Sequence, residues 1–344
     1  MKGKISALSV LFLAAALCLP GCKGNVNTAA TGAEGAADTR EAAKEVFAAM
    51  PGTEKPERDE AQKPKAPEAG EEGKAEGTAA EEAVILVVSF GTSYKESRDV
   101  TIGAIEEAIA TAYPRYPVRR AFTAQKIIDI LKERDGLEVD NMAQALDRAV
   151  ADGVKTLIVQ PTHLMDGMEY RDMVQELENY NGDFAQIVVG QPLLADEEDL
   201  DAVAKAVTDA TSSYDDGETA VVFMGHGTQA PSNQIYASLQ EKLAEKGFEN
   251  YYIGTVEATP TLDDITAALR GAGKYKKVVL EPLMVVAGDH ANNDMAGDGE
   301  DSWKAVMEGE GYEVECLLHG LGELKAIQDI YVRHVKAAMD GLNQ

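Results

Sequence analysis

Residues 85–93 read ILVVSFGTS, and residues 221–229 read VVFMGHGTQ. Each stretch is an apolar run that stops at a glycine-threonine pair. A second pair follows the same rule, with VKTLIVQP at 154–161 and KKVVLEP at 276–282. Continuous runs of Val, Ile and Leu are typical of strands buried on both faces of a parallel sheet. The repetition indicates that the folded part of the chain is a duplication of one α/β unit.

Apolar strands alternate with amphipathic helices from residue 83 onward. Strands are predicted at 84–90, 118–122, 156–164, 186–193, 219–225, 251–257, 277–286 and 314–318. Helices are predicted between them, at 98–113, 124–133, 142–151, 170–179, 199–211, 234–246, 262–271, 302–309 and 324–342. This alternation predicts an α/β fold with helices on both faces of parallel sheets. We expect two similar doubly wound domains, 83–213 and 214–344, with an active-site cleft between them.

The first 82 residues have a different composition. Residues 1–21 combine a short basic start with an apolar run too short for an ordinary membrane span, as in a secretory signal. The run ends in Leu-Pro-Gly before Cys22, which is similar to a bacterial lipobox. We therefore expect an exported protein anchored to a membrane by lipid on Cys22; a plain signal peptide with a chance cysteine is the alternative. Residues 22–82 are poor in apolar side chains and are predicted to form a disordered tether.

Charge and motif content narrow the function classes. The formal net charge is −27, which argues against nucleic acid or an anionic membrane surface as the main partner. An acidic ligand then needs a locally basic pocket. Of the three cysteines, the mature domain would keep only Cys316, so no internal disulfide is predicted. The chain has no GxGxxG, Walker, CxxC or nucleophile-elbow motif, so nucleotide and thiol chemistry have no support.

Three potential metal ligands follow consecutive strands of the second half, namely His226, Glu257 and His290. Ligands of open parallel sheets bind beyond the carboxyl ends of the strands, so these side chains are expected to converge. Two imidazoles and a carboxylate suit Co²⁺, Fe²⁺, Ni²⁺ or Zn²⁺ and leave coordination positions open. Each residue alone has an ordinary alternative role. His226 could be a turn residue, Glu257 a helix cap or an ion-pair partner, and His290 a solvated loop histidine. Their joint placement favours a metal site.

The first half offers different groups at the corresponding places. Phe90 occupies the position of His226, while His163 follows a later strand and Glu169 begins a helix. A structural role is the alternative for both polar residues, since acids are favoured in the first turn of any helix and His163 suits a domain interface. The Asp/Asn cluster at 289–294 fails as an EF-hand loop, because its third position is alanine and its sixth is aspartate. We expect that cluster to shape a turn and cap the next helix.

Seven segments carry a family resemblance. They are SFGTSYKESRDVTI (89–102), RAFTAQKI (120–127), PTHLMDGMEY (161–170), FMGHGTQ (223–229), IGTVEATP (253–260), PLMVVAGDHANNDMAGDGEDSW (282–303) and GLGE (320–323). With these segments the chain resembles the class II tetrapyrrole chelatases, and closely the anaerobic sirohydrochlorin cobaltochelatases. The segments span nearly the whole folded region in the same order.

The resemblance implies insertion of Co²⁺ into sirohydrochlorin on the route to cobalamin. It implies that His226, Glu257 and His290 hold the metal and that Glu169 belongs to the active site. As a hypothesis, His226 released by the metal, or Glu169, accepts a pyrrole proton. Many relatives carry a second histidine soon after GHGT, whereas this chain has Gln229, which puts an auxiliary metal or haem contact there in doubt.

Sirohydrochlorin carries many carboxylates, so cations are expected in the cleft. The candidates for binding them lie near strand ends of the first half and are Arg120, Arg98 and Lys95. Phe90 and His163 are candidates for the remaining substrate contacts. Iron insertion towards sirohaem stays open, because the same ligands serve Fe²⁺. A non-catalytic exported carrier of metal or tetrapyrrole also stays open, because cobalamin synthesis is normally cytoplasmic. An oligomer is possible.

Overall fold

The computed structural model describes residues 82–342, which belong to one compact unit, Gly73–Gln344. The predicted signal, the anchor at Cys22 and nearly all of the predicted tether lie outside the described residues. Within the described range, no helix has the length and apolar character that crossing a membrane requires.

The first half forms a four-stranded parallel sheet. Its strands are β1 (Ala83–Ser89), β2 (Val118–Phe122), β3 (Thr156–Pro161) and β4 (Gln186–Val189). They lie in the order β2-β1-β3-β4, and Val87 of β1 sits opposite Arg120 and Gln160 of its neighbours. Its helices are α2 (Lys95–Val100), α3 (Ile102–Ala112), α4 (Gln125–Asp135), α5 (Met142–Ala151) and α6 (Met168–Glu178).

The second half repeats this sheet. Its strands are β5 (Thr219–Gly225), β6 (Tyr251–Thr255), β7 (Lys277–Pro282) and β8 (Glu313–Cys316), in the parallel order β6-β5-β7-β8. The remaining helices are α7 (Glu197–Ala210), α8 (Gln234–Glu245), α9 (Leu262–Ala272), α10 (Trp303–Gly309) and α11 (Lys325–Gly341), with short turns η3 (Ser212–Tyr214), η4 (Pro231–Asn233), η5 (Ala291–Met295, π-helical) and η6 (Leu321–Glu323). The matching strand orders confirm the α/β fold and the two similar units predicted from the repeated segments.

Side-chain alternation along the strands builds separate cores. In β1, Val84, Leu86 and Val88 pack with α5 and α6, while Ile85 and Val87 face the opposite side. That opposite side belongs to one continuous cluster that also includes Val221 and Phe223 of β5, so it joins the two halves. Because successive strand residues point to opposite faces, apolar residues at every position are what a doubly covered sheet requires.

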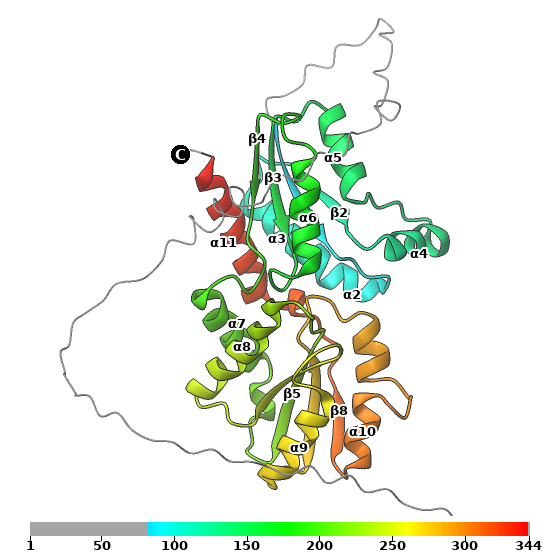
Figure 1. Ribbon diagram of the computed structural model, residues 1–344, viewed down its shortest axis with the longest axis vertical. Coiled ribbons are helices and arrows are strands. Elements are labelled where there is room, and N and C mark those ends of the chain that lie inside the picture. Colours follow the sequence, from blue (N-terminus) through cyan, green and yellow to red (C-terminus); the bar gives the residue numbers. More distant parts are fainter. Residues whose placement is uncertain (1–81, 343–344) are drawn as a thin grey trace, which may run out of the picture. The chain divides into compact units, whose positions relative to one another are not determined.

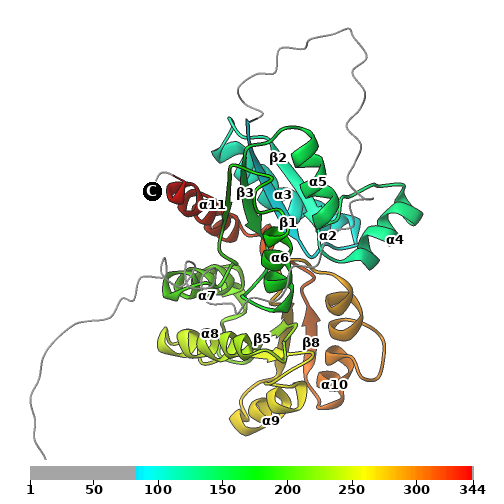
Figure 2. The same cartoon turned by 45° about the horizontal axis from the view of Figure 1, so that its top comes forward.

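Two helices cross between the halves. In both views α11 lies along the first sheet, beside α3, and α7 lies beside α8 of the second half (Figures 1 and 2). The hydroxyl of Tyr331 on α11 donates to the carbonyl of Thr162, 2.9 Å away. Tyr113 donates likewise to the Val332 carbonyl at 2.8 Å. The division of the chain at residues 213 and 214 stays a prediction, and the packing of these helices crosses it.

Several predicted elements were too long. The strands predicted to end at residues 164, 193, 257 and 286 end at Pro161, Val189, Thr255 and Pro282. Their apolar pattern continues because the following residues face the interior or a cleft rather than a neighbouring strand. The predicted helix 98–113 is broken at Thr101 (φ −111°, ψ −80°) into α2 and α3. Thr101 is fully buried, packed where a Cβ on Gly320 or Gly322 would meet it, and this tertiary contact is absent from any local pattern.

Glu281 in β7 is a buried acid that lowers stability at neutral pH. Its Oε2 has no hydrogen-bond partner among the described residues, and burial, the largest cause, raises its pKa to about 7 from 4.5. In the unfolded chain Glu281 loses its proton above about pH 4.5, whereas in the folded chain it keeps the proton up to about pH 7. The free energy of unfolding therefore falls as the pH rises towards 7.

We expect the free energy of unfolding of Glu281→Gln to rise relative to wild type, by up to about 3 kcal/mol, between pH 5 and pH 8. Urea unfolding at both pH values measures this gain. Glu313→Gln, at an exposed position on β8, is the control, and equal pH dependence in the two variants would contradict the prediction.

Candidate metal centre

The first two predicted ligands lie at adjacent strand ends. His226 directly follows β5, and Glu257 lies two residues beyond β6. The Glu257 N–H donates to the His226 carbonyl at 2.9 Å, so the backbone pairing of β5 with β6 continues past the strands and sets both side chains side by side. Gly225 permits this turn, because a Cβ there would lie 2.3 Å from the Tyr236 ring. Gly227 has φ +84°, a backbone conformation that residues other than glycine rarely adopt.

His290 reaches the same place from the segment after β7. It begins the helical turn that continues as η5, and the Asn292 amide closes this turn on the Gly288 carbonyl at 2.7 Å. The Ala287 N–H donates to the Ser97 Oγ at 3.0 Å, which ties the segment to α2 of the first half. The position of His290 therefore depends on both halves of the chain.

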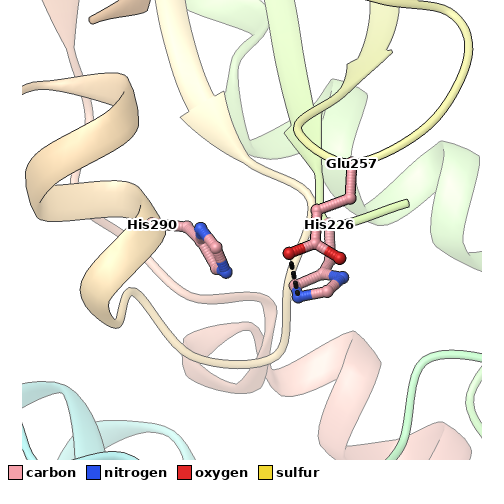
Figure 3. A group of neighbouring side chains, drawn as sticks. All are labelled: His226, Glu257 and His290. Carbon is pink, nitrogen blue, oxygen red and sulfur yellow. Dashed lines mark ion pairs between the residues drawn. The ribbon is translucent and has the colours of Figure 1, made fainter. Parts of the chain in front are cut away.

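The three side chains converge (Figure 3). One ligand atom from each of His226, Glu257 and His290 lies within 4.8 Å of the others, and His226 Nε2 is 3.9 Å from Glu257 Oε1. The two imidazole rings meet edge to face, with centroids 4.8 Å apart. Ligand atoms bound at about 2.0–2.2 Å in a tetrahedral site lie about 3.3–3.6 Å apart. Side-chain movements of about an ångström therefore bring these atoms to binding distance.

Hydrogen bonds orient both imidazoles towards the centre. The Nδ1 of His226 lies 2.8 Å from the Gly227 carbonyl, which can only accept, so Nδ1 carries the proton. The Nδ1 of His290 lies 2.6 Å from Oδ2 of Asp294. In both rings the Nε2 lone pair is then free to bind a metal, which is the tautomer that metal-ligating histidines adopt. The donor set fits a borderline divalent ion.

Asp294 belongs to the Asp/Asn cluster for which only turn shaping and helix capping were predicted, so its functional position was missed. The available signal is the spacing of four residues after His290, which places both on one face of a helix. Its carboxylate fixes the direction of the His290 imidazole and holds the proton on Nδ1. We expect Asp294→Asn to weaken Co²⁺ binding about 10–100-fold. Titration with Co²⁺ followed by absorbance measures this loss. Asp298→Asn, on the same loop with a fully exposed side chain, is the control and should bind as wild type does.

A cleft of about 280 Å³ adjoins the metal centre. Its walls bring together several predicted residues from both halves: Phe90, His163, Glu169, His226 and His290. Phe90 is 51% exposed, and Glu169 is an exposed carboxylate in the first turn of α6. The predicted cleft between strand ends is thus present, and a carboxylate and an aromatic ring share it with two of the metal ligands.

His163 is a neutral histidine in the cleft wall. Both ring nitrogens are buried and have no partner among the described residues. Burial lowers its pKa to about 4, so the ring is uncharged at neutral pH. Its neighbour Tyr170 meets it edge to face, at 6.5 Å between centroids. The satisfied interface histidine considered from the sequence therefore does not describe this residue.

Arg120 and Arg98 do not lie where the sequence analysis expected them. Arg120 on β2 makes two hydrogen bonds to the Glu106 carboxylate, at 2.7 and 2.5 Å. Arg98 is buried and donates to the Thr92 carbonyl at 3.3 Å. Neither residue lines the cleft. Each guanidinium is bound by a partner inside the first half. The position of a residue at a strand end does not show which partner its side chain will meet.

Two tyrosines support the site without any signal in the sequence. The hydroxyl of Tyr236 accepts a hydrogen bond from the Gly227 N–H at 3.2 Å, beneath the His226 turn. Tyr94 donates to Asp289 at 3.4 Å, next to His290. Tyr236 lies within the apolar face of α8, where its pattern is that of an ordinary core residue.

Comparisons with known proteins identify the family of this chain. Residues 83–340 match the family model described as cobalt chelatase (CbiK). The chain is 38% identical over 256 residues to the sirohydrochlorin cobaltochelatase of Salmonella typhimurium, covering 74% of this chain and 96% of that protein. It is 33% identical over 264 residues to the sirohydrochlorin cobaltochelatase CbiKC of Nitratidesulfovibrio vulgaris, covering 75% and 91%.

A solved structure supports the fold alone. SirB from Bacillus subtilis with Fe³⁺ superposes with a TM-score of 0.52 at 15% identity, over 76% of this chain and 98% of SirB. The match of the family model over most of the described residues, together with the two curated relatives, settles the family. This chain belongs to the CbiK cobalt chelatase family.

Proposed function

We propose that this protein is a metal chelatase that inserts Co²⁺ into sirohydrochlorin. The observation that carries the proposal is the convergence of His226, Glu257 and His290 beside the cleft, with both Nε2 atoms free. Family membership and the names of the two relatives support the same reaction.

The chemistry exchanges one metal ion for two protons. Co²⁺ bound by three protein ligands keeps coordination positions open for the incoming pyrrole nitrogens. As the Co–N bonds form, two pyrrole N–H bonds break and the Co–protein bonds are released. The Glu169 carboxylate lies in the cleft wall, where it accepts one pyrrole proton, and His226, once released by the metal, accepts the other. The product is cobalt-sirohydrochlorin. The cobalt keeps its oxidation state, and the proposed reaction uses no nucleotide.

Turnover distinguishes an enzyme from a carrier. Purified protein is mixed anaerobically with excess Co²⁺ and sirohydrochlorin, and the change in the tetrapyrrole absorption spectrum is followed. We expect many product molecules per protein molecule. Formation of no more than one complex per protein would instead support an exported carrier and contradict the proposal.

Cobalt is proposed as the metal on the strength of the relatives' names. The ligand set itself also suits Fe²⁺ and Ni²⁺. Parallel assays with Co²⁺ and Fe²⁺, alone and in competition, identify the preferred metal. Faster insertion of Fe²⁺ would redirect the proposal towards sirohaem.

We also propose that the protein is exported and held at a membrane by lipid on Cys22. The support is the signal-like sequence of residues 1–21 and the small residue before the cysteine. Mass spectrometry of the N-terminal peptide from membranes tests this directly. An unmodified Cys22, or an N-terminus that still carries residues 1–21, would refute the anchor.

A further inference from the structure

The cleft wall carries no basic side chain among the residues that the structure describes. Its lining includes neither lysine nor arginine, and its two carboxylates belong to Glu169 and Asp289. The carboxylate of Glu257 stands beside His226 at the same edge. Among the described residues of the lining, His163 is the only group besides His226 and His290 that can become a cation, and burial keeps it neutral. The wall is therefore acidic.

Three basic residues near the lining segments pair with acids of their own. Lys95 pairs with Asp99 at 2.7 Å, and Arg171 pairs with Asp166 at 2.8 Å. Arg134 donates to the Ser93 carbonyl at the rim, but it also makes two hydrogen bonds to Asp135. The whole chain has a formal net charge of −27, so no long-range positive potential compensates for the acidic wall.

Most of the rest of the wall is apolar, interrupted by hydroxyl groups such as those of Thr92, Ser93 and Thr228. Phe90 exposes 51% of its surface there, and Leu164, Met165, Met284 and Val286 continue the apolar lining. A flat conjugated ring can stack on such groups. The volume of about 280 Å³ is below the range of about 300–1,000 Å³ found for pockets that enclose drug-sized ligands. A tetrapyrrole is larger than those ligands, so the cleft encloses only part of it.

We propose that the cleft recognises the face of the macrocycle through apolar contacts and leaves the ring carboxylates in solvent. This inference rests on the proposed tetrapyrrole substrate and concerns what the protein recognises in it. The acidic wall opposes the carboxylates rather than binding them. Substrate selection then depends on the ring face and the central nitrogens, and the protein accepts rings that differ in their acidic side chains.

The sign of the salt effect tests the proposal. A basic subsite loses affinity for a polyanion as salt is added, whereas like charges gain affinity because salt screens their repulsion. Binding of a metal-free octacarboxylate porphyrin and a tetracarboxylate porphyrin is measured by absorbance, without cobalt. We expect octacarboxylate affinity to rise between an ionic strength of about 0.01 M and about 0.15 M, by up to about twofold for each like-charge contact, because salt partly screens the repulsion. At low salt the tetracarboxylate ring should bind more tightly than the octacarboxylate ring. Its affinity should also change less as salt is added.

Three variants locate the effect. Asp289→Asn removes a charge from the wall and should raise octacarboxylate affinity about fivefold at low ionic strength and about threefold at about 0.15 M. Asp298→Asn, on the same loop but outside the cleft lining, is the matched control and should change affinity less. Phe90→Ala should weaken both rings alike and leave their salt response unchanged, because it removes only apolar contact.

The outcomes separate this inference from the proposed function. Affinity that falls with added salt, or absence of measurable binding of either ring, overturns the inference. If the protein turns over cobalt and sirohydrochlorin while salt weakens binding, the function stands and the inference fails. If binding behaves as expected without turnover, the inference stands and the protein is a carrier.

Discussion

Replacing His226 or His290 with alanine is expected to abolish cobalt insertion at ordinary metal concentrations. Each change removes one of three ligands and leaves a two-ligand set that cannot hold Co²⁺ in place. Loss of a group that only orients a metal ligand costs about 10–100-fold, so loss of the ligand itself should cost at least about 100-fold in Co²⁺ affinity. Glu257→Ala should also lower the affinity for Co²⁺, since it removes the only carboxylate among the three candidate ligands.

Two measurements check this result. Co²⁺ affinity is determined by titration, and insertion is followed by the tetrapyrrole spectrum. His319→Ala is the control, because His319 is 61% exposed, bonds Glu323 on η6 and does not line the cleft. Retention of wild-type rates in both His226→Ala and His290→Ala would remove the metal centre from the reaction.

The second large effect is expected on stability, from Asp199 at the contact of α7 with α11. Asp199 is fully buried and accepts hydrogen bonds from Arg333 at 2.7 Å and from His334 at 3.1 Å. It also accepts one from the Ala195 N–H at 3.0 Å. The other ring nitrogen of His334 lies 3.1 Å from the Gln191 carbonyl. Asp199→Asn leaves this buried cluster without its anion, which costs about 3–5 kcal/mol of unfolding free energy for a broken buried pair.

The pKa of Asp199 gives the pH window for this effect. Burial alone raises the pKa, but the hydrogen bond and charge of His334, the Ala195 N–H and Arg333 outweigh it, so the pKa lies below its usual 3.8. A lowered pKa adds stability above pH 3.8 that is lost as pH falls through the folded value. The difference between wild type and Asp199→Asn should therefore be full at pH 7 and shrink below about pH 4.

Urea unfolding at pH 7 and at low pH measures the difference. Glu198→Gln is a close control, because Glu198 is 73% exposed and lies 3.6 Å from the same Arg333. An exposed pair contributes at most about 1 kcal/mol. Equal losses in the two variants at pH 7 would show that the buried cluster adds no more than a surface ion pair.

Much of the fold was predictable because its signals are local. The apolar runs at 85–93 and 221–229 correctly indicated buried parallel strands, and their similarity indicated two related units. Strand ends were less predictable, since apolar residues such as Leu164 and Met284 continue the pattern while facing a cleft instead of a neighbouring strand. The break at Thr101 depends on contact with the segment around Gly320, far along the chain.

The sequence by itself determined the α/β class, the duplication and the convergence of three candidate ligands, His226, Glu257 and His290. These follow from residue periodicity and from the rule that parallel strands end at one edge of their sheet. Only the tertiary structure decided that α7 and α11 cross between the halves, that Asp294 orients His290, and that Arg98 and Arg120 are held away from the cleft. The physical reason is that periodicity records which side of an element is apolar. It does not record which partner a polar side chain meets when distant segments pack together.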